Sequence, residues 1–142
     1  MNPLLQQVQI SDLELKANTF DNDVTRKIKT NLSFESRFLP GNLTGFLLVF
    51  ELVPENEANG FLLKLKAVAH FEADAPIDEA FKESSFVKVS APAIVFPYIR
   101  AYVSNLTLNS GYEPIMLPFL QFCKTCRLNR SIAVTTRDTP AT

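Results

Sequence analysis

The fold of this chain is decided by residues 90–122, which read Ser-Ala-Pro-Ala-Ile-Val-Phe-Pro-Tyr-Ile-Arg-Ala-Tyr-Val-Ser-Asn-Leu-Thr-Leu-Asn-Ser-Gly-Tyr-Glu-Pro-Ile-Met-Leu-Pro-Phe-Leu-Gln-Phe. The first twenty residues predict a helix. Ser90 is placed to cap it, and Pro92 stands in the first turn, where its missing N–H is not needed. The Asn-Ser-Gly run at 109–111 predicts the end of the helix.

The apolar residues of this helix cover more than one face. One row is Ile94, Tyr98, Ala101 and Leu108, and Arg100 is the only charged residue between Ser90 and Asn109. A helix that is apolar on most sides is buried on more than one side, so we expect a second copy of the chain to cover part of it. The residues expected at this contact between copies are Ile94, Val95, Tyr98, Ile99, Tyr102 and Leu106.

The residues after the helix form a second apolar unit, which we call the proline segment (residues 112–122). Pro114 and Pro118 interrupt it, so it cannot form a regular helix and must lie extended against an apolar surface. In one interpretation it closes the edge of the core or a subunit contact. In the other it walls a groove for extended polypeptide, because methionine and aromatic side chains form adaptable surfaces. The candidate binding residues are Tyr112, Ile115, Met116, Leu117, Phe119 and Phe122.

Four strands are predicted before the helix, at residues 5–17, 28–38, 46–53 and 61–72. The second alternates apolar and polar residues, which is typical of a half-buried antiparallel strand, and the third is apolar in both phases. The first strand changes phase halfway, which predicts a bulge near Ser11 and Asp12.

The order of these elements predicts an α+β fold, in which a four-stranded antiparallel sheet (a meander) is followed by a long helix packed on the sheet. A short helix at 78–86, capped by Asp78, is expected between them. We expect one domain at residues 1–122. Residues 123–142 lose their periodicity and predict a loose tail, or a short partner-dependent strand at 132–135.

Composition narrows the classes of partner and cellular location that we expect for this protein. The 142 residues carry a formal charge of −1, which argues against nucleic acid as a partner. Neither a signal peptide nor an apolar span is recognised, so we expect a cytoplasmic protein without membrane insertion.

No catalytic constellation is found, and we do not expect an enzyme, a metal or a cofactor. The single histidine, His70, has no ligand or catalytic partner at a suitable spacing. Cys123 and Cys126 form one Cys-X-X-Cys pair, which is half of a structural zinc site. The favoured interpretation is that this pair has no specific structural or chemical role, and the alternative is a zinc or redox role.

The quoted stretch resembles the protein-export chaperone family SecB. The resemblance lies in Phe96-Pro97-Tyr98-Ile99-Arg100, in the helix that continues to Gly111, and in the proline segment with Phe119 and Phe122. It covers about residues 5–122, and the chain resembles a divergent member without the family's second long helix.

The resemblance implies an ATP-independent holdase in the cytoplasm, a homotetramer built from two dimers, which binds unfolded or precursor polypeptides for protein export and translocation. In the family, an acidic surface on the first and fourth strands docks the motor SecA. Asp12 and Glu14 are the candidates here, but Lys16 and Lys64 stand where acids are found. This reversal speaks against docking of SecA. The alternative is an interaction module with one dedicated partner, such as a SecB-like chaperone associated with a toxin–antitoxin pair.

Overall fold

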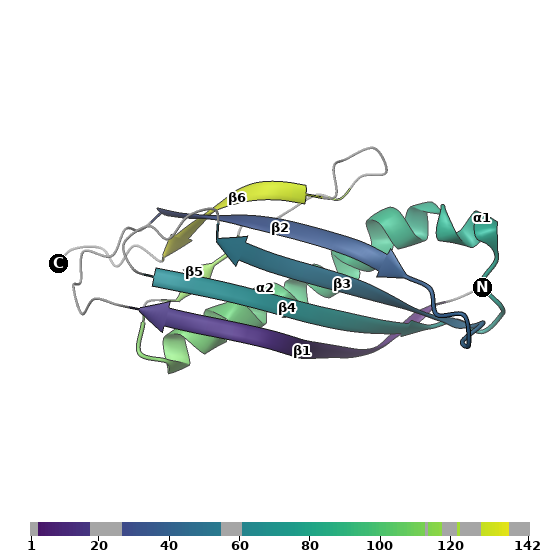
Figure 1. The fold of residues 1–142 in the computed structure, drawn as a ribbon, viewed down its shortest axis with the longest axis horizontal. Helices are drawn as coiled ribbons and strands as arrows, with labels where there is room; N and C mark the ends of the chain where they lie inside the picture. The colour runs from purple at the N-terminus through teal and green to yellow at the C-terminus, as the bar shows by residue number, and fades with distance from the viewer. Residues whose placement is uncertain are drawn as a thin grey trace.

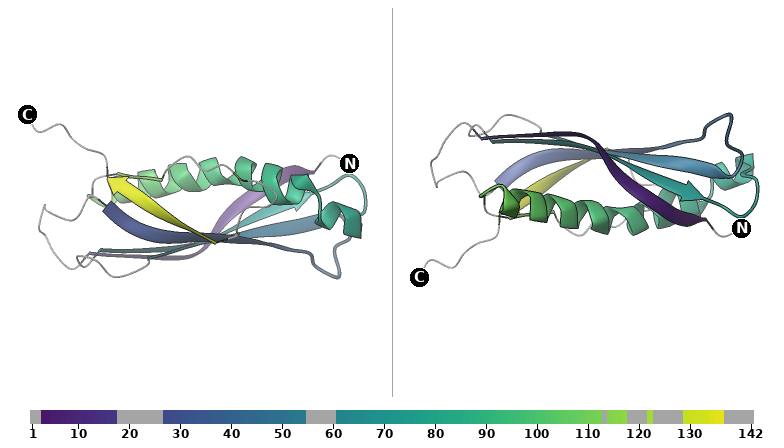
Figure 2. Two further views of the ribbon diagram at one scale, coloured as in Figure 1. Left: turned by 90° about the horizontal axis from the view of Figure 1, so that it is seen from above. Right: turned by 90° about the horizontal axis from the view of Figure 1, so that it is seen from below.

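The computed structural model describes residues 3–17, 27–54, 61–112, 114–117, 122 and 129–136. A twisted antiparallel sheet carries one long helix along one of its faces (Figures 1 and 2). The strands are β1 (Leu4–Ala17), β2 (Lys27–Arg37), β3 (Gly45–Pro54), β4 (Phe61–Glu72), β5 (Ile115–Met116) and β6 (Asn129–Thr136). The helical elements are α1 (Glu79–Lys82), the π-helix η2 (Phe86–Ser90) and α2 (Ala91–Asn109). The predicted fold class is confirmed.

The strand order differs from a simple meander. It is β1-β4-β3-β2-β6-β5, so β2, β3 and β4 form a meander while β1 pairs with β4. Periodicity reveals the buried face of a strand but not its neighbour, and nine residues separate β1 from β2, enough for β1 to leave that side of the sheet. The β1–β4 register is chemically matched, because Asp12 lies opposite Lys66 and Glu14 opposite Lys64.

The bulge predicted in the first strand is confirmed. The register of β1 against β4 shifts between Ile10 and Asp12, and a second shift occurs between Leu5 and Gln7. The shift lets Val8 and Ile10, and then Leu15, pack against the core although the sequence changes phase between them.

The C-terminal part of the described chain adds to the sheet. Residues 129–136, expected in a loose tail or as a partner-dependent strand at 132–135, form β6, which pairs with β2 of the same chain. Ile132 is opposite Thr30 and Val134 opposite Ile28. The short periodicity suggests a strand only at 132–135 and does not identify its neighbour, which is the edge of β2.

The long helix α2 is entered from a preceding helical turn rather than from a cap at Ser90. Asp78 caps α1 as expected, since its Oδ1 accepts a hydrogen bond from Phe81 N at 2.7 Å. Ser90 does not cap α2, because η2 is already helical and leads directly into it. At the other end, Gly111 takes a positive φ of 91° and Tyr112 N donates to Thr107 O at 3.0 Å, which completes the predicted stop.

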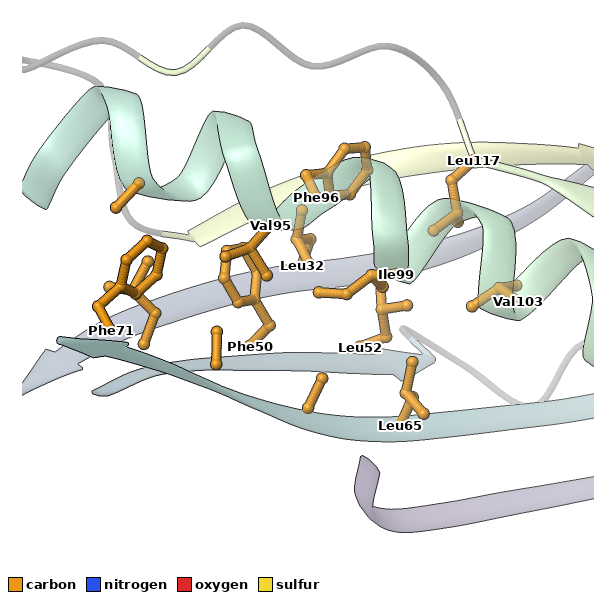
Figure 3. Packing of buried hydrophobic residues seen from close by; sticks show 14 of the residues in the cluster. Leu32, Phe50, Leu52, Leu65, Phe71, Val95, Phe96, Ile99, Val103 and Leu117 are labelled. Atoms are coloured by element: carbon orange, nitrogen blue, oxygen red, sulfur yellow. The ribbon is translucent and has the colours of Figure 1, made fainter. Parts of the chain in front are cut away.

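The core lies between α2 and the sheet. Val95, Ile99 and Val103 point from one stripe of the helix toward Phe50 and Leu65 on the strands (Figure 3). By length and composition, Glu79–Asn109 also passes the test for a membrane-spanning helix. Because its inner stripe is buried against the sheet, it is the core helix of this fold.

The phenylalanines are mostly internal. Four are buried in the core cluster and five more pack against it; they are Phe34, Phe38, Phe46, Phe50, Phe71, Phe81, Phe86, Phe96 and Phe122. The apolar surface of the described chain is instead supplied by aliphatic side chains, tyrosines and a methionine, including Ile94, Tyr98, Leu108, Tyr112 and Met116.

Candidate polypeptide-binding groove

Two polar side chains of α2 hold the proline segment in place. Thr107 is fully buried, and its Oγ1 accepts a hydrogen bond from Ile115 N at 2.9 Å while it donates to Val103 O at 2.9 Å. Arg100 Nε donates to Leu117 O at 2.6 Å. Both bonds use backbone groups, so they fix the path of residues 115–117 irrespective of the side chains there.

Residues 115–117 of the segment alternate between core and surface. Ile115 and Leu117 are 2% and 1% exposed, whereas Met116 between them is 40% exposed. The Met116 Sδ lies 3.5 Å from Ser104 Oγ on α2. A short extended stretch turns successive side chains to opposite sides, and here this leaves one methionine beside the outer surface of the helix.

A groove of about 480 Å³ runs along the outer side of α2, next to Met116. Its lining residues are Ala93, Phe96, Pro97, Arg100, Ala101, Ser104, Asn105, Met116 and Phe122. From Ala93 to Asn105 the helix rises by about 18 Å, which matches about five residues of extended chain. The walls are mainly apolar, and Arg100 is the one charged side chain among the lining residues.

Phe122 connects this groove to the sheet. Its ring packs edge to face against the rings of Phe96 on α2 and Phe34 on β2. The distances between ring centroids are 6.0 and 5.5 Å. Edge-to-face pairs at these distances are favourable, and they place one aromatic ring between helix and strand. One end of the groove therefore adjoins β2.

The predicted binding residues divide into two groups. Met116 and Phe122 line the groove, and Tyr112 is exposed at the end of α2. Ile115 and Leu117 are core residues that carry the segment without facing solvent. Phe119 lies outside the described residues.

The residues predicted at the contact between copies also divide into buried and exposed ones. Val95 and Ile99 are buried against the sheet of their own chain, and Tyr102 and Leu106 pack partly against the core. Ile94 and Tyr98 are 41% and 58% exposed, and Leu108 extends this stripe. The contact between copies stays a prediction and now rests on these three residues.

Asp12 and Glu14 lie beside lysines. Lys16 Nζ approaches Glu14 Oε1 to 2.9 Å, and this hydrogen bond, followed by the charges of Lys16 and Lys64, lowers the pKa of Glu14 from its ordinary value. Such exposed pairs add little to stability. Their effect is on the surface potential, because the lysines reduce the negative charge of this part of β1.

The described residues hold no group of three or more histidine, cysteine, aspartate or glutamate side chains that suits a metal ion. His70 Nε2 lies 3.2 Å from Gln9 Oε1 on the neighbouring strand, which is an ordinary cross-strand contact. Cys123 and Cys126 lie outside the described residues.

The two anchoring residues, Thr107 and Arg100, were missed as a pair by sequence reasoning. Arg100 left a signal, since it is the only charge in an otherwise apolar helix. Thr107 left no signal. A threonine on a buried stripe is identified as an anchor only when the N–H that donates a hydrogen bond to it is known.

The anchoring bond of Thr107 can be tested by Thr107→Val. The change keeps the side-chain shape and leaves the buried Ile115 N–H without its acceptor, so we expect a loss of about 1–3 kcal/mol in the free energy of unfolding. Urea unfolding at constant m measures the loss. The matched control is Ser104→Ala, with a change below about 0.5 kcal/mol. Equal midpoints for the two variants would contradict the anchoring role.

Comparison with known proteins shows which family and which relatives this chain is similar to. The family model described as preprotein translocase subunit SecB matches residues 5–128. The protein-export protein SecB of Roseobacter denitrificans is 28% identical over 116 residues, which is 82% of this chain and 58% of the relative. An uncharacterized protein of Methanocaldococcus jannaschii is 27% identical over 104 residues, covering 69% of this chain and 64% of that protein. The chain thus spans about three-fifths of the length of these curated relatives.

Solved structures support the fold. A SecB-like chaperone of Mycobacterium tuberculosis, in complex with a peptide from an antitoxin, superposes with a TM-score of 0.60 at 17% identity, covering 83% of this chain and 90% of that one. A protein of unknown function from Streptococcus agalactiae superposes with a TM-score of 0.56 at 14% identity, covering 84% of this chain and 98% of that one. The expectation of a non-enzymatic protein agrees with the family that the model describes. Since that model spans most of its residues, the chain belongs to the SecB family.

Proposed function

We propose that this protein is an ATP-independent holdase that binds extended segments of unfolded polypeptides in the groove along α2. The observation that carries the proposal is the combination of family membership with an apolar groove that the exposed Met116 helps to line. Methionine adapts to differently shaped side chains, which suits a site that must accept many sequences.

The dimensions of the groove agree with this role. A length of about 18 Å accepts about five extended residues and is too short for a folded domain. The described lining has no cluster of acids or bases, so apolar contact dominates the binding. We further propose that copies of the chain assemble through the Ile94–Tyr98–Leu108 stripe, in the cytoplasm, which would place several grooves on one particle.

The test is suppression of aggregation. The purified chain, without ATP, is expected to slow light scattering by a chemically unfolded enzyme on dilution. Met116→Glu places a charge inside the apolar groove, and the penalty of several kcal/mol for its desolvation should weaken binding at least tenfold. The matched control is Leu43→Glu, at a residue 69% exposed and not part of the groove, which should protect like the unchanged chain. No protection at stoichiometric excess would refute the holdase.

A second candidate is a module for one dedicated partner, coupled to neither SecA nor general export. Two observations favour it: Lys16 and Lys64 neutralise the acids of β1, and the related fold in Mycobacterium tuberculosis is bound to an antitoxin peptide. This candidate predicts that affinity capture from the host returns one dominant protein at stoichiometric amounts. Recovery of many unrelated unfolded proteins would contradict it and support the general holdase.

A further inference from the structure

We infer that the turn between β2 and β3 is a docking point for a folded partner protein, which receives two exposed leucines in an apolar pocket rimmed by lysine and arginine. We call residues 39–44 the leucine turn. The turn lies at one end of the sheet, the end that also holds the N-terminus and α1 (Figure 1). The inference goes beyond the proposed function and does not depend on it, because the residues that line the groove do not include the leucine turn.

The two leucines of this turn have no place in the core. Leu39 and Leu43 are 49% and 69% exposed, and they flank a tight turn in which Asn42 N donates to Leu39 O at 3.1 Å. Among the described residues, neither leucine belongs to the core cluster or packs against it. The apolar contacts of these strand ends are made by Phe38 and Phe46, whose ring centroids lie 5.6 Å apart. Two large apolar side chains that the fold does not need are typical of a binding surface.

The conformation of the turn is fixed by hydrogen bonds, although its leucines are exposed. The Asn42 Oδ1 accepts from Thr44 N at 3.3 Å, and Thr44 Oγ1 donates to Glu72 Oε1 on β4. Leu43 O accepts from Ile77 N at 2.7 Å, which ties the turn to the segment after β4. A surface that is ordered before it binds loses little conformational entropy on binding. The leucines are therefore presented in a form that suits specific recognition.

The shape of this surface selects a folded partner. Figure 2 shows the turn projecting from the end of the sheet, on the side away from α2. An extended polypeptide binds in a groove or along a strand edge, whereas a projecting turn inserts its side chains into a pocket of the other protein. Leu39 and Leu43 are the anchors that such a pocket would hold.

The charge beside the turn selects a basic rim for that pocket. Residues 71–78 contain no lysine or arginine but three acids, all of them exposed: Glu72, Asp74 and Asp78. This segment lies next to the turn, because Ala73 N donates to Thr44 O at 2.8 Å. Lysine and arginine around the pocket would complement these acids, speed association and disfavour acidic competitors. An anionic lipid surface is disfavoured for the same reason.

The closing experiment begins with site-specific photocrosslinking. The full chain carries photoreactive benzoylphenylalanine at position 43 in its host, and position 31 is the control. Asn31 is exposed on β2, and its distance from Leu39 along the strand is about 26 Å. We expect one folded protein to be crosslinked from position 43 and not from position 31. Crosslinks from position 43 to many unfolded proteins, to another copy of the chain or to no protein overturn the inference.

Titration of the purified crosslinked protein then tests the chemistry of the contact. Leu43→Glu removes an anchor and places a charge in the pocket, so we expect binding to weaken at least tenfold. Asn31→Glu adds the same charge away from the turn and should leave the affinity unchanged. Glu72→Gln keeps an acceptor for Thr44 and removes one charge, so association should slow about threefold and depend less on salt. Equal affinities for Leu43→Glu and the unchanged chain would contradict the inference.

The aggregation assay separates this surface from the groove. Leu43→Glu, with unchanged circular dichroism, is expected to lose the partner and still protect an unfolded enzyme like the unchanged chain. A variant that keeps its secondary structure and loses both properties shows that the turn serves client binding, which overturns the inference. An unchanged chain that binds the partner and gives no protection refutes the holdase alone.

Discussion

Phe46→Ala is expected to remove about 3–5 kcal/mol from the free energy of unfolding, which is a third or more of the stability of a typical domain. Phe46 is 1% exposed and lies at the centre of an aromatic cluster. Its ring centroid is 5.0 Å from that of Phe71, and it contacts three further rings, those of Phe38, Phe81 and Phe86, at 5.6–6.4 Å. Truncation leaves a cavity that four partners line.

Thermal or urea unfolding measures this loss, and Phe38→Ala provides the graded control. Phe38 is half-buried and stacks on Phe46 alone among the ring pairs found in the described residues, with Lys82 Nζ 5.2 Å from its centroid. Its removal should destabilise the chain by less than half as much. If both variants lose the same stability, Phe46 is not the centre of the cluster.

Tyr98→Asp is expected to dissociate the assembly of chains. In the described chain Tyr98 is 58% exposed, between Ile94 and Leu108 on one stripe of α2. If a second copy covers this stripe, an aspartate there becomes a buried charge without a partner, which destabilises the contact by about 3–5 kcal/mol per site. Tyr102, the next tyrosine along α2, is a poorer choice because it packs partly against the core, so its substitution would also unfold the chain.

Sedimentation velocity measures the mass of the Tyr98→Asp particle against the unchanged chain. Ser85→Asp is the control, because Ser85 is exposed before η2 and lies off the stripe. We expect smaller particles for Tyr98→Asp alone, with unchanged secondary structure. A variant of full assembled mass, or an unchanged chain that is monomeric at micromolar concentration, would contradict the predicted contact.

The fold class was readable from the sequence because the buried residues of the main elements recur at strand or helix spacing. Leu32 and Leu65 are core residues at the periodic positions of their strands, and Val95, Ile99 and Val103 mark the inner stripe of α2. The position of β1 beside β4 was not readable, since it depends on pairs such as Asp12 with Lys66 that form only between distant segments. The pairing of β6 with β2 is hidden for the same reason.

The candidate site was predicted in outline. Met116 and Phe122, two of the residues predicted to bind a client, line the groove, and their binding role stays a prediction. Ile115 and Leu117 belong to the core instead, since the alternation of a short strand decides which side chains turn inward. Sequence periodicity cannot fix that phase over two residues. The phase is set by Thr107, whose hydroxyl receives the Ile115 N–H.

The two register shifts of β1 have a consequence for the protein's own solubility. β1 is the terminal strand of the sheet, and a long, regular terminal strand is a template on which identical strands stack without limit. Each shift interrupts the ladder and bends the strand, so that no long, flat row of backbone groups is presented. The edge of the sheet is thus protected from pairing with the β1 strands of other copies of the chain.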